Sequence, residues 1–390
     1  MKTIKDIKNL KGKRALLRVD FNVPMDKTKI LDDSRIKEAL LTIQYLLEKG
    51  ASIVILSHLG RPEGKKVSAL SLKPVAQRLE KLLGKKVEFL NETTGLKARE
   101  KSAKLKPGQV LMLENLRFSP YEELGDTEFA KKLSVLGNIF VQEAFSNAHR
   151  SHASMLAITK YLPSYAGLHF EKECTELTRI LAKPKKPFVF VAGGKKIGTK
   201  IDILKNIIEK ADIVLLGGGM ANTFLVAEGH EIGKSFYEED YVSDAESIIR
   251  DAYDKGVEVL FPSDVVTAKN VSENAKIEEK DVQQVDASDI IVDIGPKTIS
   301  KYAQPIKFAG TIFWNGPVGI TEYKNFSNGT KALANMMVGD ERISIVGGGD
   351  TISALEELGV MDGFTHVSTA GGAMMEFISG ADMPVIKALK

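Results

Sequence analysis

The stretch AGGKKIGTK, residues 192–200, combines the residue types that bind phosphate groups. It follows the apolar run FVFV and precedes a helical pattern that begins near Ile201. Glycine turns between a strand and a helix expose backbone N–H groups, and lysines add positive charge. The standard phosphate loop reads G-x-x-x-x-G-K-[ST], but here Gly198 is followed by Thr199 and Lys200, in the inverted order. The stretch is therefore either a turn with incidental lysines or a nucleotide site of another geometry.

Polar side chains also follow several strand-like runs in the first half of the chain. They are Asp20 and Asn22 after 14–19, His58 and Arg61 after 52–56, Arg117 after 110–113, and Arg150 (with His149 and His152) after 139–141. Arg35 belongs to the same set but lies in the first turn of a predicted helix, which follows the N-cap candidates Asp32, Asp33 and Ser34. Ligands of parallel α/β sheets bind at the carboxyl ends of the strands, so we expect these side chains at one edge. No comparable set of carboxylates neutralises the arginines. A bound anion with several charges would neutralise them, and each charge-assisted hydrogen bond to it contributes roughly 1.5–3 kcal/mol.

Each of these residues has an ordinary structural interpretation as well. Asp20 and Asn22 are common turn residues, Arg35 could be a plain first-turn residue, and His58 could be a hydrogen-bonded loop histidine. Taken together, the set favours an anion site. Other chemistries fit less well, because the chain has no G-x-S-x-G elbow and no H-E-x-x-H spacing, and Cys174 lies in a helical pattern without a partner signature.

The second half offers a different way to bind anions. Eight of the eleven arginines precede residue 151, whereas 23 of the 33 glycines lie at or after Gly193. In VGGGDTISAL, residues 346–355, glycines allow close backbone approach, Asp350 can ligate Mg²⁺, and Thr351 starts a helix suited to phosphate. STAGGAMMEF, residues 368–377, is a second glycine-to-helix start. After WNGPVG, Glu322 can accept hydrogen bonds from a ribose, or it is a solvated glutamate.

Composition indicates an ordinary globular protein of 390 residues, with 43% hydrophobic and 27% charged residues. The net charge of +3 is too small to argue for nucleic acid or membrane partners. The single Cys174 excludes an intramolecular disulfide and suits a reducing compartment. The N-terminus has no apolar h-region and no run approaches 18 apolar residues, so we expect a cytoplasmic protein.

Short apolar runs alternate with helical patterns along the whole chain. They predict buried parallel strands at 14–19, 52–56, 87–90, 110–113, 139–141, 188–191, 213–216, 257–260, 290–294, 311–314, 343–346 and 366–367. We therefore expect an α/β protein with two doubly wound parallel-sheet domains. The predicted parts are a domain at 1–167, a helical connector at 168–184 built on LHFEKECTELTRILA, a domain at 185–379, and a return of 380–390 onto the first domain.

The segments LLRVDFNVP, SHLGRP, ENLRF, AHRSH, WNGPVG, GGGDT and VSTAGGA, taken in this order, resemble the phosphoglycerate kinase family over essentially all 390 residues. The opening stretch is similar to that family's GGAK-x-x-TK turn. The resemblance implies reversible phosphoryl transfer from 1,3-bisphosphoglycerate to Mg-ADP, giving 3-phosphoglycerate and Mg-ATP. It also implies two Rossmann-like domains, a hinge-bending cleft near the connector, Mg²⁺ as cofactor and a monomer.

Site residues carried over by motif fall into three sets. The resemblance implies that the glycerate substrate contacts Asp20, Phe21, Asn22, Arg35, His58, Leu59, Gly60, Arg61, Arg117 and Arg150. It implies nucleotide contacts for Lys196, Lys200, Asn315, Pro317, Glu322, Gly348, Gly349, Asp350 and Thr351, with Asp350 on the metal. It implies catalytic roles for Arg35, Lys196, Gly371 and Gly372. A carboxylate acceptor is already a nucleophile, so no general base is expected, and alignment and charge neutralisation carry catalysis.

Three residues depart from the pattern of that family. Lys195 replaces a small residue, and we expect its side chain to point into solvent. Ala370 replaces a glycine, which would be strained if φ is positive there. Thr321 stands where an aromatic residue is frequent. Two other interpretations remain open: a nucleotide-binding paralogue without transfer activity, and a non-kinase α/β protein that binds phosphorylated metabolites by its arginines alone.

Overall fold

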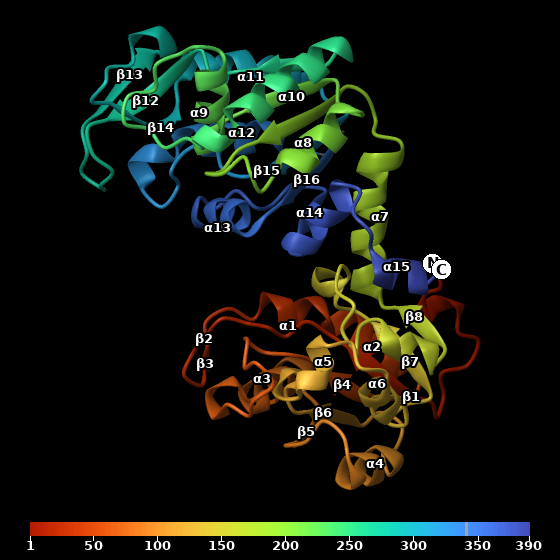
Figure 1. Cartoon of the computed structure of the whole chain (residues 1–390). Coiled ribbons are helices and arrows are strands. Elements are labelled where there is room, and N and C mark those ends of the chain that lie inside the picture. The colour runs from red at the N-terminus through yellow and green to blue at the C-terminus, as the bar shows by residue number, and fades with distance from the viewer. Residues whose placement is uncertain (340–341) are drawn as a thin grey trace. The chain divides into compact units, whose positions relative to one another are not determined.

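The computed structural model describes residues 1–339 and 342–390 and divides into two compact units (Figure 1). The first unit contains residues 1–175 and 382–390, and the second contains residues 176–381. Helix α7 (Leu168–Ala182) begins in the first unit and ends in the second, over the range LHFEKECTELTRILA expected from sequence. No helix among the described residues is both long and apolar enough to cross a membrane.

The first unit is built on a six-stranded parallel sheet in the order β5-β6-β4-β1-β7-β8. The strands are β1 (Arg14–Arg18), β4 (Ser52–Leu56), β5 (Val87–Leu90), β6 (Val110–Leu113), β7 (Ile139–Gln142) and β8 (Ser164–Ala166), with a small hairpin of β2 (Met25–Asp26) and β3 (Lys29–Ile30). Its helices are α1 (Ser34–Glu38), α2 (Leu40–Glu48), α3 (Lys73–Leu83), α4 (Leu96–Ala103), α5 (Pro120–Glu123), α6 (Thr127–Ser134) and α15 (Pro384–Ala388).

Both faces of this sheet are buried, which is why its strands read as continuous apolar runs. In β1, Ala15 and Leu17 pack in the core on one face, and Leu16 packs in a separate core on the other. The two chain ends meet in this unit, because the Lys2 N–H donates to the Leu389 carbonyl at 2.9 Å (Figure 1).

The second unit contains another six-stranded parallel sheet, in the order β11-β10-β9-β15-β16-β17. The strands are β9 (Phe188–Ala192), β10 (Ile213–Leu216), β11 (Glu258–Leu260), β15 (Thr311–Asn315), β16 (Ile343–Gly347) and β17 (His366–Ser368). Its helices are α8 (Ile201–Ile208), α9 (Gly218–Ala227), α10 (Val242–Asp254), α11 (Pro296–Phe308), α12 (Asn328–Met337), α13 (Gly349–Glu357) and α14 (Gly372–Ile378). The predicted pair of parallel-sheet domains is therefore confirmed.

One strand prediction was wrong in its sheet and direction. The run 290–294 forms β14 (Ile290–Ile294), but it pairs antiparallel with β12 (Asp264–Ala268), which also pairs with β13 (Ile277–Asp281). This three-stranded sheet lies outside the parallel one. An apolar run reports burial and not strand direction, and the charged, largely exposed β13 carried no apolar signal.

The core of the second unit includes two stacked rings from neighbouring strands. Phe190 of β9 and Phe313 of β15 are fully buried, with ring centroids 5.2 Å apart. We predict that Phe313→Ala lowers the free energy of unfolding by about 3–5 kcal/mol, because it leaves a cavity beside Phe190. Denaturant unfolding measures this, with Tyr253→Ala, at an 83% exposed position, as the control. Equal losses in the two variants would contradict this packing.

Candidate functional site

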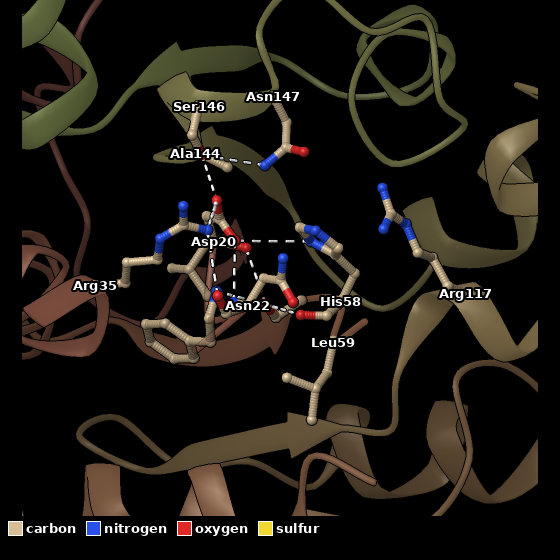
Figure 2. Close-up of polar contacts among 12 residues, drawn as sticks. Asp20, Asn22, Arg35, His58, Leu59, Arg117, Ala144, Ser146 and Asn147 are labelled. Atoms are coloured by element: carbon tan, nitrogen blue, oxygen red, sulfur yellow. Dashed lines mark hydrogen bonds and ion pairs between the residues drawn. The ribbon is translucent and has the colours of Figure 1, made fainter. Parts of the chain in front are cut away.

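Asp20 is the centre of a polar cluster in the first unit, just beyond the end of β1. Its Oδ2 accepts from Arg35 Nη1 at 2.8 Å and from the Ser146 hydroxyl, and its Oδ1 accepts the Asn22 N–H at 3.0 Å. Figure 2 shows Asp20 between Arg35 and His58. Burial disfavours the charged carboxylate, but the positive charge of Arg35 and these hydrogen bonds outweigh it and hold the pKa of Asp20 well below its usual range.

His58 is buried on the other side of Asp20. Its Nδ1 is 3.3 Å from Arg18 Nη2, and because an arginine can only donate, Nδ1 is the acceptor. Nδ1 therefore makes no hydrogen bond to Asp20, whose Oδ1 is 3.9 Å away. Burial lowers the pKa of His58 well below its usual value, and the positive charge of Arg18 adds to this against the attraction of Asp20. The imidazole is neutral near pH 7.

Arg18, Arg35, Arg117 and Arg150 form what we call the arginine cluster. Arg18 and Arg117 are almost fully buried, and burial lowers the pKa of each below its ordinary value. Repulsion from Arg150 lowers both pKa values further, and Arg117 also lowers that of Arg18. Arg117 Nη1 donates to the Gly60 carbonyl at 2.7 Å, which joins the cluster to the loop after β4.

The expectation that no carboxylates offset these arginines was wrong. Asp20 pairs with Arg35, Glu123 lies 3.1 Å from Arg117 Nε, and the buried Glu122 attracts Arg18. Burial raises the pKa of Glu122, partly opposed by Arg18 and by hydrogen bonds from Ser154. Glu122 and Glu123 lie in α5, after β6 and beyond Arg117, the last residue of that segment predicted for the site.

Some residues predicted for this edge do not join the polar cluster. The side chains of Phe21 and Leu59 are buried in the hydrophobic core, so only their backbone can face a ligand. Arg61 is exposed and makes none of the contacts described above. The side chain of Asn22 stabilises the loop after β4, since its Oδ1 accepts the Gly60 N–H at 2.8 Å. The predicted N-cap Asp33 makes no cap bond and instead bonds Arg78.

The second unit contains a pocket of about 440 Å³ at the carboxyl ends of its parallel strands. Its lining includes the turn after β9, the first turn of α9, the loop after β15 and the first turn of α13. The apolar part of the wall is formed by Phe236, Val271, Ile290, Ile291 and Ile320. The ionic lining side chains are Lys195, Lys234, Glu322 and Asp350.

Closely packed backbones build the floor of this pocket. A Cβ on Gly218, whose φ is +65°, would lie 2.8 Å from the carbonyl oxygens of both Gly194 and Pro317. Lys200 Nζ donates to the carbonyls of Gly193 at 2.5 Å and Asn315 at 3.1 Å. Burial lowers the pKa of Lys200 to about 8, with Asp350 opposing.

Comparison with known proteins shows which family the chain belongs to. The family model described as phosphoglycerate kinase matches residues 4–381. The chain belongs to the phosphoglycerate kinase family. Phosphoglycerate kinases of Dictyoglomus turgidum and Chloroflexus aurantiacus are 46% and 47% identical, covering 100% of this chain and 99% and 98% of theirs.

Solved structures give the same result. A phosphoglycerate kinase structure from Coxiella burnetii has a TM-score of 0.92 at 43% identity, covering 99% of this chain and 98% of that one. The corresponding structure from Pyrococcus horikoshii has a TM-score of 0.86 at 34% identity, covering 100% and 98%. The chain is a phosphotransferase, and its activity is that of a phosphoglycerate kinase, with the family's general role in glycolysis.

At Ala370 and Lys195, two of the positions that depart from the family pattern, the structure differs from what the sequence suggested. Ala370 is not among the non-glycine residues with positive φ in the described chain, so the predicted strain is absent; the positive φ of 53° falls on Gly371. Lys195 does not simply point into solvent: its Nζ lies 4.8 Å from the centre of the Phe236 ring, and it lines the pocket. Thr321 also lines the pocket.

Some of the residues predicted to contact nucleotide are exposed, and others are buried and support the backbone of the pocket. Glu322 and Asp350 are exposed lining residues, and Lys196 is exposed but is not part of the lining. Thr351 is buried, and its hydroxyl accepts the Gly316 N–H at 2.7 Å, so it braces the loop after β15. Asn315 is also buried and donates to the Gly347 carbonyl at 2.8 Å.

The remaining predicted nucleotide residues are Gly348, Gly349 and Pro317, and Gly372 is one of the predicted catalytic residues. Gly348 has φ +100° as N-cap of α13, and a Cβ there would lie 2.8 Å from Asn315 Nδ2. Gly349 opens α13 and Gly372 opens α14. Pro317 lines the pocket.

Magnesium is the cofactor that the family resemblance implies. The described residues contain no group of three acidic, histidine or cysteine side chains that could hold a metal ion. Mg²⁺ in phosphotransferases is usually bound by one or two carboxylates together with substrate phosphates and water. The exposed carboxylate of Asp350 at the pocket therefore fits a metal–nucleotide complex and not a metal held by protein alone.

Several residues of these sites were missed from the sequence. Arg18 lies two positions before Asp20 and four before Asn22, and side chains at this spacing share a strand face, so the period could have revealed it. Ser146 and Phe236 carried no comparable signal, because their contacts come from segments distant in sequence.

We predict that Gly218→Ala destabilises the chain more than Gly229→Ala. Both glycines have positive φ, but a Cβ on Gly229 meets nothing within 4 Å, whereas one on Gly218 meets three backbone atoms. The extra cost is about 1–3 kcal/mol, because backbone cannot move aside as a flexible side chain can. Denaturant unfolding of the two variants measures it, and equal losses would show that the pocket floor tolerates a methyl group.

Proposed function

We propose that the arginine cluster, with Asp20, Asn22 and His58, binds the glycerate substrate, and that the pocket of the second unit binds the Mg-nucleotide. The reaction is reversible phosphoryl transfer from 1,3-bisphosphoglycerate to Mg-ADP, giving 3-phosphoglycerate and Mg-ATP. The observation that carries the proposal is the arginine cluster itself. Its four guanidinium groups, two of them buried, are only partly offset by the three carboxylates Asp20, Glu122 and Glu123, which favours an anionic ligand.

The assignment of ligands to the two sites rests on their chemistry. Arginine forks suit the carboxylate and 3-phosphate of a small, highly charged substrate. The second pocket offers apolar wall residues for a base, glycine turns for phosphates and Glu322 for a ribose. Lys196, Lys200 and the first turn of α13 would meet the phosphates, and Asp350 would hold the Mg²⁺, which supplies charge neutralisation on the phosphate oxygens when bound.

The catalytic proposal needs no general base. The acceptor in the direction of acyl phosphate synthesis is a carboxylate, which is ionised at pH 7. The ionised carboxylate carries no proton that the neutral His58 would have to remove. We propose that Arg35 and Lys196 offset the charge that develops on the transferred group, and that the N–H groups at Gly371 and Gly372 add to this. Alignment of the two substrates supplies the remainder.

Several wider assignments belong to the same proposal. We assign residues 1–167 and 380–390 to the glycerate-binding domain, 168–184 to the interdomain helix and 185–379 to the nucleotide-binding domain. Substrates held on separate domains must meet, so we propose hinge closure near α7. We also propose a cytoplasmic monomer: the sequence has a single cysteine, Cys174, which suits a reducing compartment, and the proposed site residues come from one chain.

We predict that Arg35→Ala and Lys196→Ala each lower turnover by about 10²–10³-fold, since each removes a cation that stabilises transferred charge. The assay supplies Mg-ATP and 3-phosphoglycerate and couples the acyl phosphate to its reductive dehydrogenase. Arg99→Ala, at an exposed position of α4, is the matched control and should retain parental turnover.

The outcomes of this assay separate the alternatives. A folded parent that binds both ligands without turnover would favour the silent paralogue. Binding of phosphorylated metabolites without Mg-ATP binding would favour the non-kinase interpretation. Full activity in Lys196→Ala alone would remove that lysine from catalysis and leave the role of Arg35 standing.

A further inference from the structure

We propose that Ser146 is a positioning residue that keeps one edge of the Arg35 guanidinium available to the substrate. The inference rests on the proposed function, because it concerns how Arg35 is prepared to bind the glycerate anion. Ser146 does not itself have to touch the substrate. It acts through Asp20, the carboxylate that the two side chains share (Figure 2).

The hydroxyl of Ser146 is held in one orientation. Ser146 lies in the short 3-10 turn Phe145–Asn147, which follows β7, the strand beside β1. Its Oγ accepts from Asn147 Nδ2 at 3.2 Å and donates to Asp20 Oδ2. Because an amide N–H₂ group can only donate, the serine proton is directed to Asp20. Asn147 is buried, which limits the freedom of this pair.

Arg35 uses only one nitrogen on this carboxylate. Nη1 donates to Asp20 Oδ2 at 2.8 Å and to the Asn22 carbonyl at 3.3 Å. Within residues 1–339 and 342–390, no hydrogen bond is made by Nε or Nη2 of Arg35, whose side chain is 32% exposed. An arginine fork left half used in this way retains donors for a second carboxylate or phosphate.

The geometry of Asp20 explains why the fork is not fully used. A bidentate pair would turn both carboxylate oxygens to Arg35. Oδ1 is instead held by the Asn22 N–H at 3.0 Å, and Oδ2 is shared with the Ser146 hydroxyl. Removing the hydroxyl takes away one of the contacts that fix the orientation of the carboxylate, so that Asp20 can turn, give up the Asn22 N–H on Oδ1 and present both oxygens to Arg35. Arg35 would then be neutralised within the protein and lose affinity for the substrate.

The test is a double-mutant cycle read out as calorimetric affinity for 3-phosphoglycerate. We expect Ser146→Ala to weaken binding about tenfold and Ser146→Thr, which keeps the hydroxyl, to restore affinity to within about threefold of the parent. Ser164→Ala is a matched control on β8, where the hydroxyl donates to the Leu162 carbonyl at 2.8 Å; it should bind as the parent does.

The cycle separates positioning from a general structural effect. A lysine ammonium cannot form a bidentate pair, so in the Arg35→Lys background Ser146→Ala should change affinity by less than about twofold. An equal loss in both backgrounds, or no loss in the parent background, would overturn the inference. Failure of the parent to bind 3-phosphoglycerate at all would instead overturn the proposed function, and the inference with it.

Discussion

Buried arginines repel one another, and this constraint governs the first unit. Each guanidinium taken out of water costs several kcal/mol unless negative charge comes with it. Asp20, Glu122 and Glu123 supply some of that charge from β1 and α5. Their positions set the hydrogen-bond network around His58 and Arg18, and the remaining positive charge is what the proposed anionic substrate would meet. The sheet order places these segments together, because β6, β4, β1 and β7 are neighbours.

The second unit meets a different constraint, since the floor of its pocket is made chiefly of backbone. Turns after β9 and β15 and the start of α9 approach too closely for any side chain at Gly193, Gly218 or Gly316. The buried ammonium of Lys200 ties two of these turns together through their carbonyls. Lys200 is therefore a brace of the pocket floor, and the phosphate contact proposed for it would be a second role of the same side chain.

The sequence was sufficient for the parallel strands other than β8 and for most strand-end polar residues, because both follow from local patterns. Asp20, His58 and Arg117 come together as expected, since adjacent parallel strands end at one edge. Tertiary partners were not predictable: the acids beside Arg117, the ring beneath Lys195 and the hydroxyl on Asp20 all come from other segments. Strand direction at 290–294 and the backbone angle of Ala370 also depend on packing and not on local composition.

The central claim is that the two substrates bind to different units through different chemistry. The most direct measurement is a nuclear magnetic resonance titration that follows the arginine side-chain N–H resonances of the full chain. The account predicts that 3-phosphoglycerate shifts the resonances of Arg35, Arg117 and Arg150, whereas Mg-ADP alone leaves them in place and shifts backbone resonances around Gly194 and Gly218. The account would be contradicted if Mg-ADP shifted the resonances of the arginine cluster, or if 3-phosphoglycerate shifted only those of the glycine turns.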